Sequence, residues 1–305
     1  MAAAILAHAT AAAAGPPPTP VATTDTSPPR LQRTTEELVQ LHVTSAGYGV
    51  LTGVWIHALS GGDSPWSFAL PAVGVAALGM GTTAWLDHRQ RLTLGLPQAI
   101  VTDTFIGAEI AAAWVWHFRA ANAPDADWSP QAEASVLWGG ATLGAGLGAL
   151  RYAFSPSAPG QAAFTGSVTL WSGVLSGLLA GALSSDPITR DDHASRATAF
   201  GLELGVIAGS FLGRRLKPSI GWVHALDAGA LLGGGAFMGT YLLATGNSFD
   251  DRAVFAVGAA GVGAGLVSAA LLAPRLGWPR TLAFSVAPQF TPSTGAAGMT
   301  LHAVF

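Results

Sequence analysis

The chain has 305 residues, of which 14 are Lys or Arg and 17 are Asp or Glu, so it is only 10% charged and its net charge is −3. Soluble domains carry about 25% charged residues, and half of this chain is hydrophobic, so its composition argues against a soluble domain and predicts several membrane spans. The absence of cysteine excludes disulfides, thiolate catalysis and Cys-based zinc sites, and nothing in the charge pattern predicts a nucleic-acid partner.

The first 35 residues are predicted to precede the membrane domain. "MAAAILAHATAAAA" (1–14) has an apolar stretch and A-x-A-like cleavage positions, but it lacks the basic n-region of a secretory signal. Two interpretations stay open for it: a signal whose start codon is misplaced, or an Ala-rich tail. "GPPPTPVATTDTSPP" (15–29) is rich in Pro and Thr and predicts an extended, disordered linker.

Residues 36–275 are predicted to form an all-α polytopic domain of eight transmembrane helices. Each segment has the roughly 20 mainly apolar residues that a span needs, and none alternates between polar and apolar residues as a barrel strand does. Turn-forming residues separate the eight segments, which lie at 41–59, 66–86, 94–116, 134–153, 161–183, 196–213, 219–243 and 253–273.

Internal repeats are predicted from the glycines. G-x-x-x-x-G-x-G recurs as "GVAALGMG" (74–81), "GGATLGAG" (139–146) and "GAAGVGAG" (258–265), while "GVLTG" (49–53) and "GVLSG" (173–177) lie 124 residues apart. The domain is therefore either a four-helix unit used twice or a helical hairpin used four times. The four hairpin units would lie at about 41–86, 94–153, 161–213 and 219–273.

The charges of the loops predict the topology. If eight helices alternate in direction, one side of the membrane collects ten basic residues, namely Arg30, Arg33, Arg89, Arg91, Arg151, Arg214, Arg215, Lys217, Arg275 and Arg280. The other side collects four, namely Arg119, Arg190, Arg196 and Arg252. Because the side rich in Lys and Arg stays in the cytoplasm, both termini are predicted to be cytoplasmic, in the inner membrane of a bacterial envelope. A genuine signal at the N-terminus would instead predict export.

The C-terminal tail, 276–305, does not fit a ninth helix. "TLAFSVAPQF" (281–290) and "GMTLHAVF" (298–305) are short, partly alternating segments joined by "TPSTGAA". This pattern predicts a β-hairpin.

The chain resembles glycine-rich, helix-pair-repeat membrane proteins of the bacterial envelope. "EELVQLHVTSAGYGVLTGVW" (36–55), "SAPGQAAFTGSVTLWSGVLSG" (157–177) and "RRLKPSIGWVHALDAGALLGG" (214–234) look like successive copies of their repeat unit. The resemblance covers about residues 36–305. It implies the architecture and the location in the envelope, and it brings no assigned activity.

The glycines of the spans are predicted to be helix-packing positions. "LDAGALLGGGAFMG" (226–239) lacks the Lys and Ser/Thr of a phosphate-binding loop and lies within a long apolar run, so no nucleotide is expected as a partner. Small residues four apart let helix backbones approach in a membrane. The predicted packing positions are Gly49, Gly53, Gly74, Gly79, Gly139, Gly144, Gly173, Gly177, Gly229, Gly233, Gly258 and Gly263.

Four acids within the spans form the candidate polar site: Asp103, Glu109, Glu203 and Asp227. A charge at mid-bilayer costs at least about 2.5 kcal/mol, so these acids should face the interior of the bundle. Asp103 and Asp227 are related by the 124-residue offset, and His224 is close enough in sequence to share a proton with Asp227. One interpretation is a pathway for protons or cations; the other is that each acid is protonated or hydrogen-bonded across a helix interface.

No motif predicts an enzyme, a cofactor or a metal site. "RDDHASR" (190–196) groups acids and a histidine in a predicted outer loop, and a solvated turn is favoured there over a metal site. "EELVQLH" (36–42) lacks the further residues of an intramembrane metalloprotease. The favoured function is a glycine-packed structural or oligomerising component of the envelope, and the alternative is a transporter or channel for protons or small cations. The expected partners are the lipid bilayer and a second copy of the chain or another membrane protein.

Overall fold

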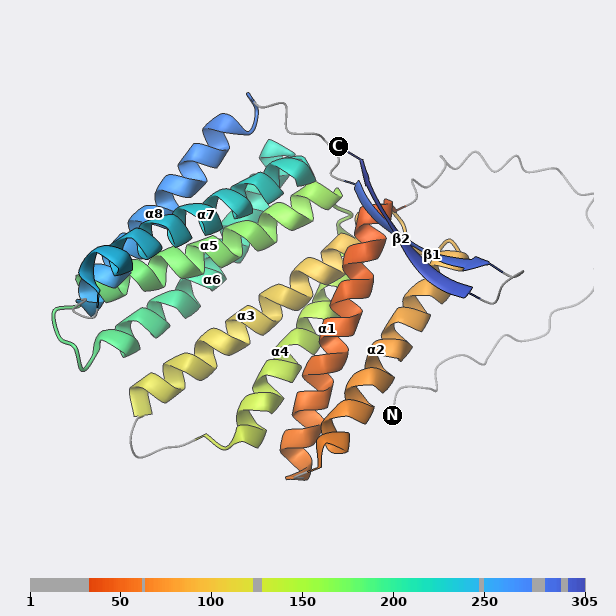
Figure 1. Cartoon of the computed structure of the whole chain (residues 1–305), viewed down its shortest axis with the longest axis horizontal. Helices are drawn as coiled ribbons and strands as arrows, with labels where there is room; N and C mark the ends of the chain where they lie inside the picture. The colour runs from red at the N-terminus through yellow and green to blue at the C-terminus, as the bar shows by residue number, and fades with distance from the viewer. Residues whose placement is uncertain are drawn as a thin grey trace, which may run out of the picture. The chain divides into compact units, whose positions relative to one another are not determined.

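The computed structural model describes residues 33–61, 64–122, 128–246, 250–275, 283–291 and 296–304. These residues form eight helices and two strands: α1 (Thr35–Ser60), α2 (Pro65–His88), α3 (Leu96–Asn122), α4 (Pro130–Phe154), α5 (Pro159–Leu183), α6 (Arg190–Leu216), α7 (Ile220–Thr245), α8 (Asp251–Leu272), β1 (Ala283–Thr291) and β2 (Ala296–Val304) (Figure 1). The prediction of a helical domain with eight helices is confirmed. The largest differences from the predicted segments are six residues each: α1 and α6 start six residues earlier than expected, and α3 ends six residues later.

Capping side chains explain where several helices begin. At the start of α1, the Thr34 hydroxyl accepts the backbone N–H of Glu37, and the Glu37 carboxylate accepts the backbone N–H of Thr34 at 2.8 Å. This reciprocal arrangement satisfies two backbone donors that the first turn of a helix leaves free. Serine side chains cap three more helices, at Ser64, Ser129 and Ser219. These caps set the ends of the helices a few residues outside the apolar runs.

The buried carboxylate of Glu37 also fixes the connection between α2 and α3. Its Oε1 accepts the backbone N–H of Gly95 at 2.7 Å, and the Glu37 side chain is fully buried. Gly95 has φ +88°, and a Cβ atom there would overlap the carbonyl oxygen of Ser157. Only glycine fits this position, because L-residues rarely adopt that φ and a side chain has no room. At this end of the bundle, the start of α1, the α2–α3 connection and the α4–α5 connection are thus in contact.

Helices that are neighbours in sequence form hairpins. α1 packs on α2, α3 on α4, α5 on α6 and α7 on α8 (Figure 1). Between the hairpins, α3 contacts α5 and α6. Further contacts join α1 to α3 and α4, and α5 to α7 and α8. Helices α3 and α5 therefore each touch four other helices, and the residues that position the candidate site lie along them.

The two halves of the helical domain have corresponding contacts. In the first half, α1 touches α2, α3 and α4, and α3 touches α4. In the second half, α5 touches α6, α7 and α8, and α7 touches α8. Each contact of the first half thus has its counterpart four helices later.

Within the part of the chain that the structure describes, five helices are long and apolar enough to cross a membrane by length and composition: α2, α3, α5, α7 and α8. This finding indicates a membrane location. The mean hydropathy of α1, α4 and α6 is below the same limit, so composition alone does not establish eight spans.

The described part of the C-terminal tail consists of β1 and β2. The two strands are antiparallel, and their register runs from Ala283 opposite Val304 to Thr291 opposite Ala296. The predicted lead up to residue 32 and residues 276–282 of the predicted tail lie outside the described residues.

Candidate functional site

Asp103 forms an ion pair with an arginine that the sequence analysis had assigned to a loop. Arg151 lies in the last turn of α4 and donates from Nε and from one terminal nitrogen to the two Asp103 oxygens, each at 2.9 Å. The side chains are 12% and 28% exposed. Such a two-point contact satisfies both carboxylate oxygens and neutralises the charge. Asp103 therefore fastens α3 to α4.

Asp227 is bound by two donors from one neighbouring helix. Its Oδ1 accepts the Ser167 hydroxyl at 2.6 Å and the Trp171 indole N–H at 2.8 Å, both from α5. The two donors are four residues apart, so they lie one above the other on the same face of α5. Asp227 thus connects α7 to α5, and the sequence analysis identified neither donor.

Glu203 and Glu109 have different surroundings. Glu203 of α6 accepts the indole N–H of Trp114 of α3 at 3.1 Å. Glu109 of α3 interacts electrostatically with Asp227. Within the described part of the chain, its Oε2 is buried without a hydrogen-bond partner. Glu109 is therefore the acid whose role the helix contacts do not explain.

His224, which lies three residues before Asp227 on α7, has a contact on another helix. Its Nε2 lies 3.5 Å from Oε1 of Glu36 in the first turn of α1. Burial raises the pKa of Glu36 above its ordinary value, and the charge of Glu37 adds to this rise. The charge of His224 acts in the opposite direction and lowers the pKa of Glu36.

Three of the four predicted acids are thus held by separate contacts. Asp103 binds an arginine of α4, Asp227 binds donors of α5, and Glu203 binds an indole of α3. Glu109 and Asp227 are close enough for their like charges to interact. Asp103 of α3 and Asp227 of α7, which lie 124 residues apart, have chemically different partners.

Nine of the twelve predicted packing glycines lie against another part of the chain. A Cβ atom added to any of these nine would come within 3.1 Å of a neighbouring atom: Gly49, Gly53, Gly79, Gly144, Gly173, Gly177, Gly229, Gly233 and Gly258. For most of them the neighbour belongs to the other helix of the same hairpin. The remaining three, Gly74, Gly139 and Gly263, have no atom within 4 Å of that position.

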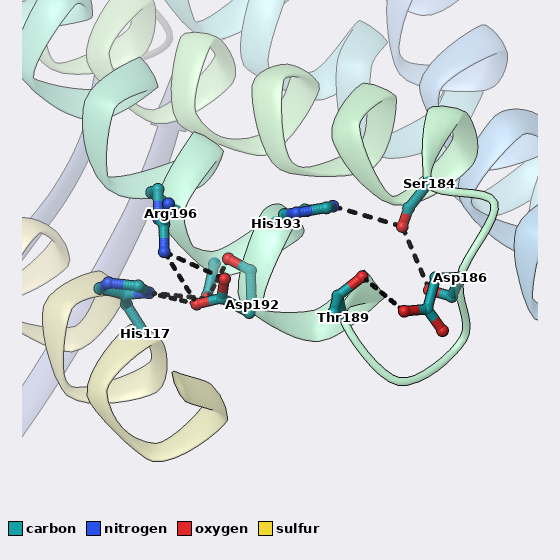
Figure 2. Close-up of polar contacts among 8 residues, drawn as sticks. His117, Ser184, Asp186, Thr189, Asp192, His193 and Arg196 are labelled. Carbon is teal, nitrogen blue, oxygen red and sulfur yellow. Dashed lines mark hydrogen bonds and ion pairs between the residues drawn. The ribbon is translucent and has the colours of Figure 1, made fainter. Parts of the chain in front are cut away.

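A polar cluster that the sequence analysis missed joins the end of α3 to the start of α6. Figure 2 shows His117 pointing at Asp192, with Nδ1 and Oδ1 at 3.1 Å, and Arg196 reaching the same carboxylate at 3.0 Å. The predicted loop "RDDHASR" is helical instead, because Asp191 and Asp192 lie in the first turn of α6, where the helix dipole favours acids.

Serine, histidine and aspartate meet in this cluster without forming a nucleophilic triad. Ser195 Oγ lies 3.5 Å from the same ring nitrogen of His117 that faces Asp192. A triad needs the serine at one ring nitrogen and the carboxylate at the other, so His117 cannot activate Ser195. Among the described residues, no group of His, Asp or Glu is arranged to hold a metal ion.

The neighbouring loop between α5 and α6 is closed by its own hydrogen bonds. Ser184 lies 3.4 Å from the ring of His193 and donates to the backbone oxygen of Asp186 at 3.2 Å (Figure 2). Thr189 donates to the Asp186 carboxylate at 3.2 Å. The cluster and this loop hold α5, α6 and α3 together at one end.

Comparison with models of known protein families, with curated proteins and with solved structures found no match to this chain.

Proposed function

We propose that the chain is an integral membrane protein of the bacterial envelope whose eight helices all cross the bilayer, and that it is a structural component that assembles through an exposed face of α2. The resemblance to helix-pair-repeat envelope proteins and the cytoplasmic position of both termini belong to this proposal. The corresponding contacts of the two halves support a four-helix unit used twice.

Exposed apolar side chains support the proposal that α4 and α6, two of the helices with lower mean hydropathy, also cross the membrane. On α6, Phe200, Leu204, Ile207 and Phe211 are each at least 50% exposed and follow one another at helical spacing. Leu143, Leu147, Leu150 and Phe154 do the same on α4. Rows of this kind in water would favour aggregation, whereas lipid surrounds them without cost. The charged residues of α6 lie mainly in its first and last turns.

The contacts of the acids favour a structural role over transport. Asp103, Asp227 and Glu203 each accept donors from a neighbouring helix, so they act as cross-links within the bundle. Hydrogen bonds between membrane helices stabilise the packed state by about 0.6 kcal/mol on average.

One face of α2 carries the proposal of assembly. α2 packs mainly on α1, and its opposite face exposes a row of small residues at helical spacing: Gly74, Ala77, Gly81 and Ala84. No atom lies within 4 Å of a Cβ added to either glycine. On α7, by comparison, Gly229 and Gly233 are contacts between helices. Another copy of the chain would find the same kind of close-approach surface here.

The mass of the purified complex tests this proposal. The full chain, resistant to alkaline extraction from membranes, should run as an oligomer in native mass spectrometry from mild detergent. Gly74→Leu and Gly81→Leu should each shift it toward the monomer by at least fivefold. Gly235→Leu is the matched control, because Gly235 is an exposed glycine of α7 with nothing within 4 Å of its Cβ position. A monomeric wild type, or dissociation by the control alone, would overturn the assembly.

Proton or cation transport remains the second candidate because of Glu109. An unpartnered, buried carboxylate oxygen close to a second acid is typical of a proton-accepting position. Liposomes containing the full chain and a pH-sensitive dye distinguish the candidates. A structural protein gives the same proton leak as empty liposomes, whereas a transporter gives a flux that Glu109→Gln and Asp227→Asn abolish.

A further inference from the structure

An apolar groove of about 550 Å³ lies between α4 and α6. Ile106, Gly107 and Ile110 of α3 form its floor, Leu143 and Leu147 belong to its α4 wall, and its α6 wall includes Val206. The volume is in the range of small-molecule sites. Among the described residues, the only charged ones that line it are Asp103 and Arg151, which neutralise each other. The groove therefore suits an uncharged hydrocarbon chain.

A second cavity, of about 340 Å³, adjoins the groove toward the basic side of the molecule. Its lining residues are Ser155, Pro156, Ala158, Gln161, Arg214 and Lys217. On each of three elements, a residue that lines the groove lies close in sequence to a residue that lines the second cavity. The pairs are Phe154 with Ser155, Thr165 with Gln161, and Ser210 with Arg214. The cavities thus follow one another along the same three elements.

The second cavity is positively charged. Arg214 and Lys217 line it, and no acid of the described part of the chain does. Arg214 donates to the Ser155 hydroxyl at 3.1 Å through one of its terminal nitrogens. An arginine has five N–H donors in a planar fork, which suits phosphate oxygens. The neighbouring Arg215 instead stacks over the Phe211 ring at 4.7 Å and lines neither cavity.

We propose that the two cavities together bind one anionic phospholipid, with an acyl chain in the groove and the headgroup phosphate at Arg214 and Lys217. The proposal rests on the membrane location proposed above, but not on the oligomer. Lipid that merely coats an apolar face would show little preference for one headgroup. A built site selects a negative headgroup, and each basic residue near the membrane surface contributes about a fivefold preference.

Native mass spectrometry of the full chain tests the site, with phosphatidylglycerol and phosphatidylcholine of identical acyl chains as the probes. The wild type should retain one phosphatidylglycerol at least tenfold better than phosphatidylcholine. Arg214→Gln and Lys217→Gln should each lower the retention of phosphatidylglycerol about fivefold. Leu147→Trp, which fills the groove, should lower the retention of both lipids. Arg215→Gln is the matched control and should change neither.

Several results would overturn the proposal. Equal retention of the two lipids by the wild type, or unchanged retention in the Arg214→Gln and Lys217→Gln variants, would remove the headgroup site. A loss of the same size with Arg215→Gln would reduce the effect to general surface charge. Displacement of the lipid by glycerol phosphate, which has no acyl chain, would assign the second cavity to a free phosphate. Lipid adducts and oligomer peaks separate by mass, so failure of this proposal is distinguishable from failure of the assembly.

Discussion

At the scale of single residues, three of the acids within the helices are bound by side chains of another helix. Arg151 holds Asp103, two donors of α5 hold Asp227, and Trp114 holds Glu203. A lone charge in a bilayer would cost several kcal/mol, so each pairing allows an acid to remain inside the helical domain. These contacts also select which helices can be neighbours.

The ion pair of Asp103 and Arg151 should behave differently when one or both partners are removed. Asp103→Leu leaves an uncompensated, partly buried arginine, so the free energy of unfolding should fall by about 3 kcal/mol. Asp103→Leu combined with Arg151→Leu should recover most of this loss, because a packed apolar pair replaces the ion pair. Unfolding in mixed micelles measures both.

The matched control for this pair is Arg196→Gln, which breaks an exposed i,i+4 pair with Asp192. It should cost less than about 1 kcal/mol. A double variant no more stable than Asp103→Leu would contradict the account of the ion pair.

A pH dependence is expected from Glu36. Burial is the largest cause of its raised pKa, so the folded chain binds this proton at a higher pH than the unfolded chain does. As the pH rises, the free energy of unfolding begins to fall near the ordinary pKa of glutamate, about 4.3. This loss is complete once the pH exceeds the raised pKa of the folded chain. Glu36→Gln should therefore abolish this loss between pH 4 and pH 7 in equilibrium unfolding. His224→Gln should enlarge it, because that histidine opposes the shift. Identical slopes in wild type and Glu36→Gln would refute the assignment.

Residue-level partners were the part of the site hardest to predict from the sequence. The acids within the spans are visible as isolated charges in apolar runs, but Ser167 and Trp171 resemble any other polar or aromatic residue of a span. Arg151 was assigned to a loop because charge near the end of an apolar run is ambiguous. The His117–Asp192 contact joins residues 75 positions apart, and no local pattern reports such a pairing.

At the scale of helices, glycine determines how closely the two members of a hairpin approach. In the α7–α8 hairpin, Gly229 and Gly233 face Gly261 and Gly265, with backbone carbonyl oxygens where a Cβ would lie. The glycine spacing of four in "LDAGALLGGGAFMG" is readable in the sequence. Which glycines remain uncovered, such as Gly235, depends on the positions of all the other helices.

Two alanine substitutions on α7 should therefore have opposite effects. Gly233→Ala inserts a methyl group against the backbone of α8 and should destabilise the fold by about 1–3 kcal/mol. Gly235→Ala meets no atom within 4 Å and should be neutral or stabilise the helix by up to about 1 kcal/mol. Thermal unfolding in detergent measures the difference. Equal effects at the two positions would show that the α7–α8 contact is not close.

At the scale of the whole molecule, charge and helix number together predict an orientation. The number of helices was readable from the apolar runs and their turns, and the structure confirms eight. The hydropathy of α1, α4 and α6 is lowered by the Gly, Thr, Ser and charged residues that make their contacts, so composition alone identifies five spans.

Single cysteines can test the orientation, because the chain has none of its own. Gln90→Cys and Pro156→Cys, on the basic side, should react with a membrane-impermeant maleimide only after the cells are opened. Ser129→Cys and Asp186→Cys should react in intact cells. Mass spectrometry of the labelled protein gives the result. Labelling of all four in intact cells, or the reverse pattern, would contradict eight spans with cytoplasmic termini.

The hairpins of sequence neighbours have a consequence for biosynthesis. Because most of the close glycine contacts join a helix to the next one along the chain, a hairpin can close as soon as its second helix leaves the ribosome. The partners of Asp103 and Glu37 are complete once α4 and the start of α5 have been made. Asp227 then finds donors on a helix that is already in place. The order of translation is thus also the order in which Asp103, Glu203 and Asp227 meet their partners.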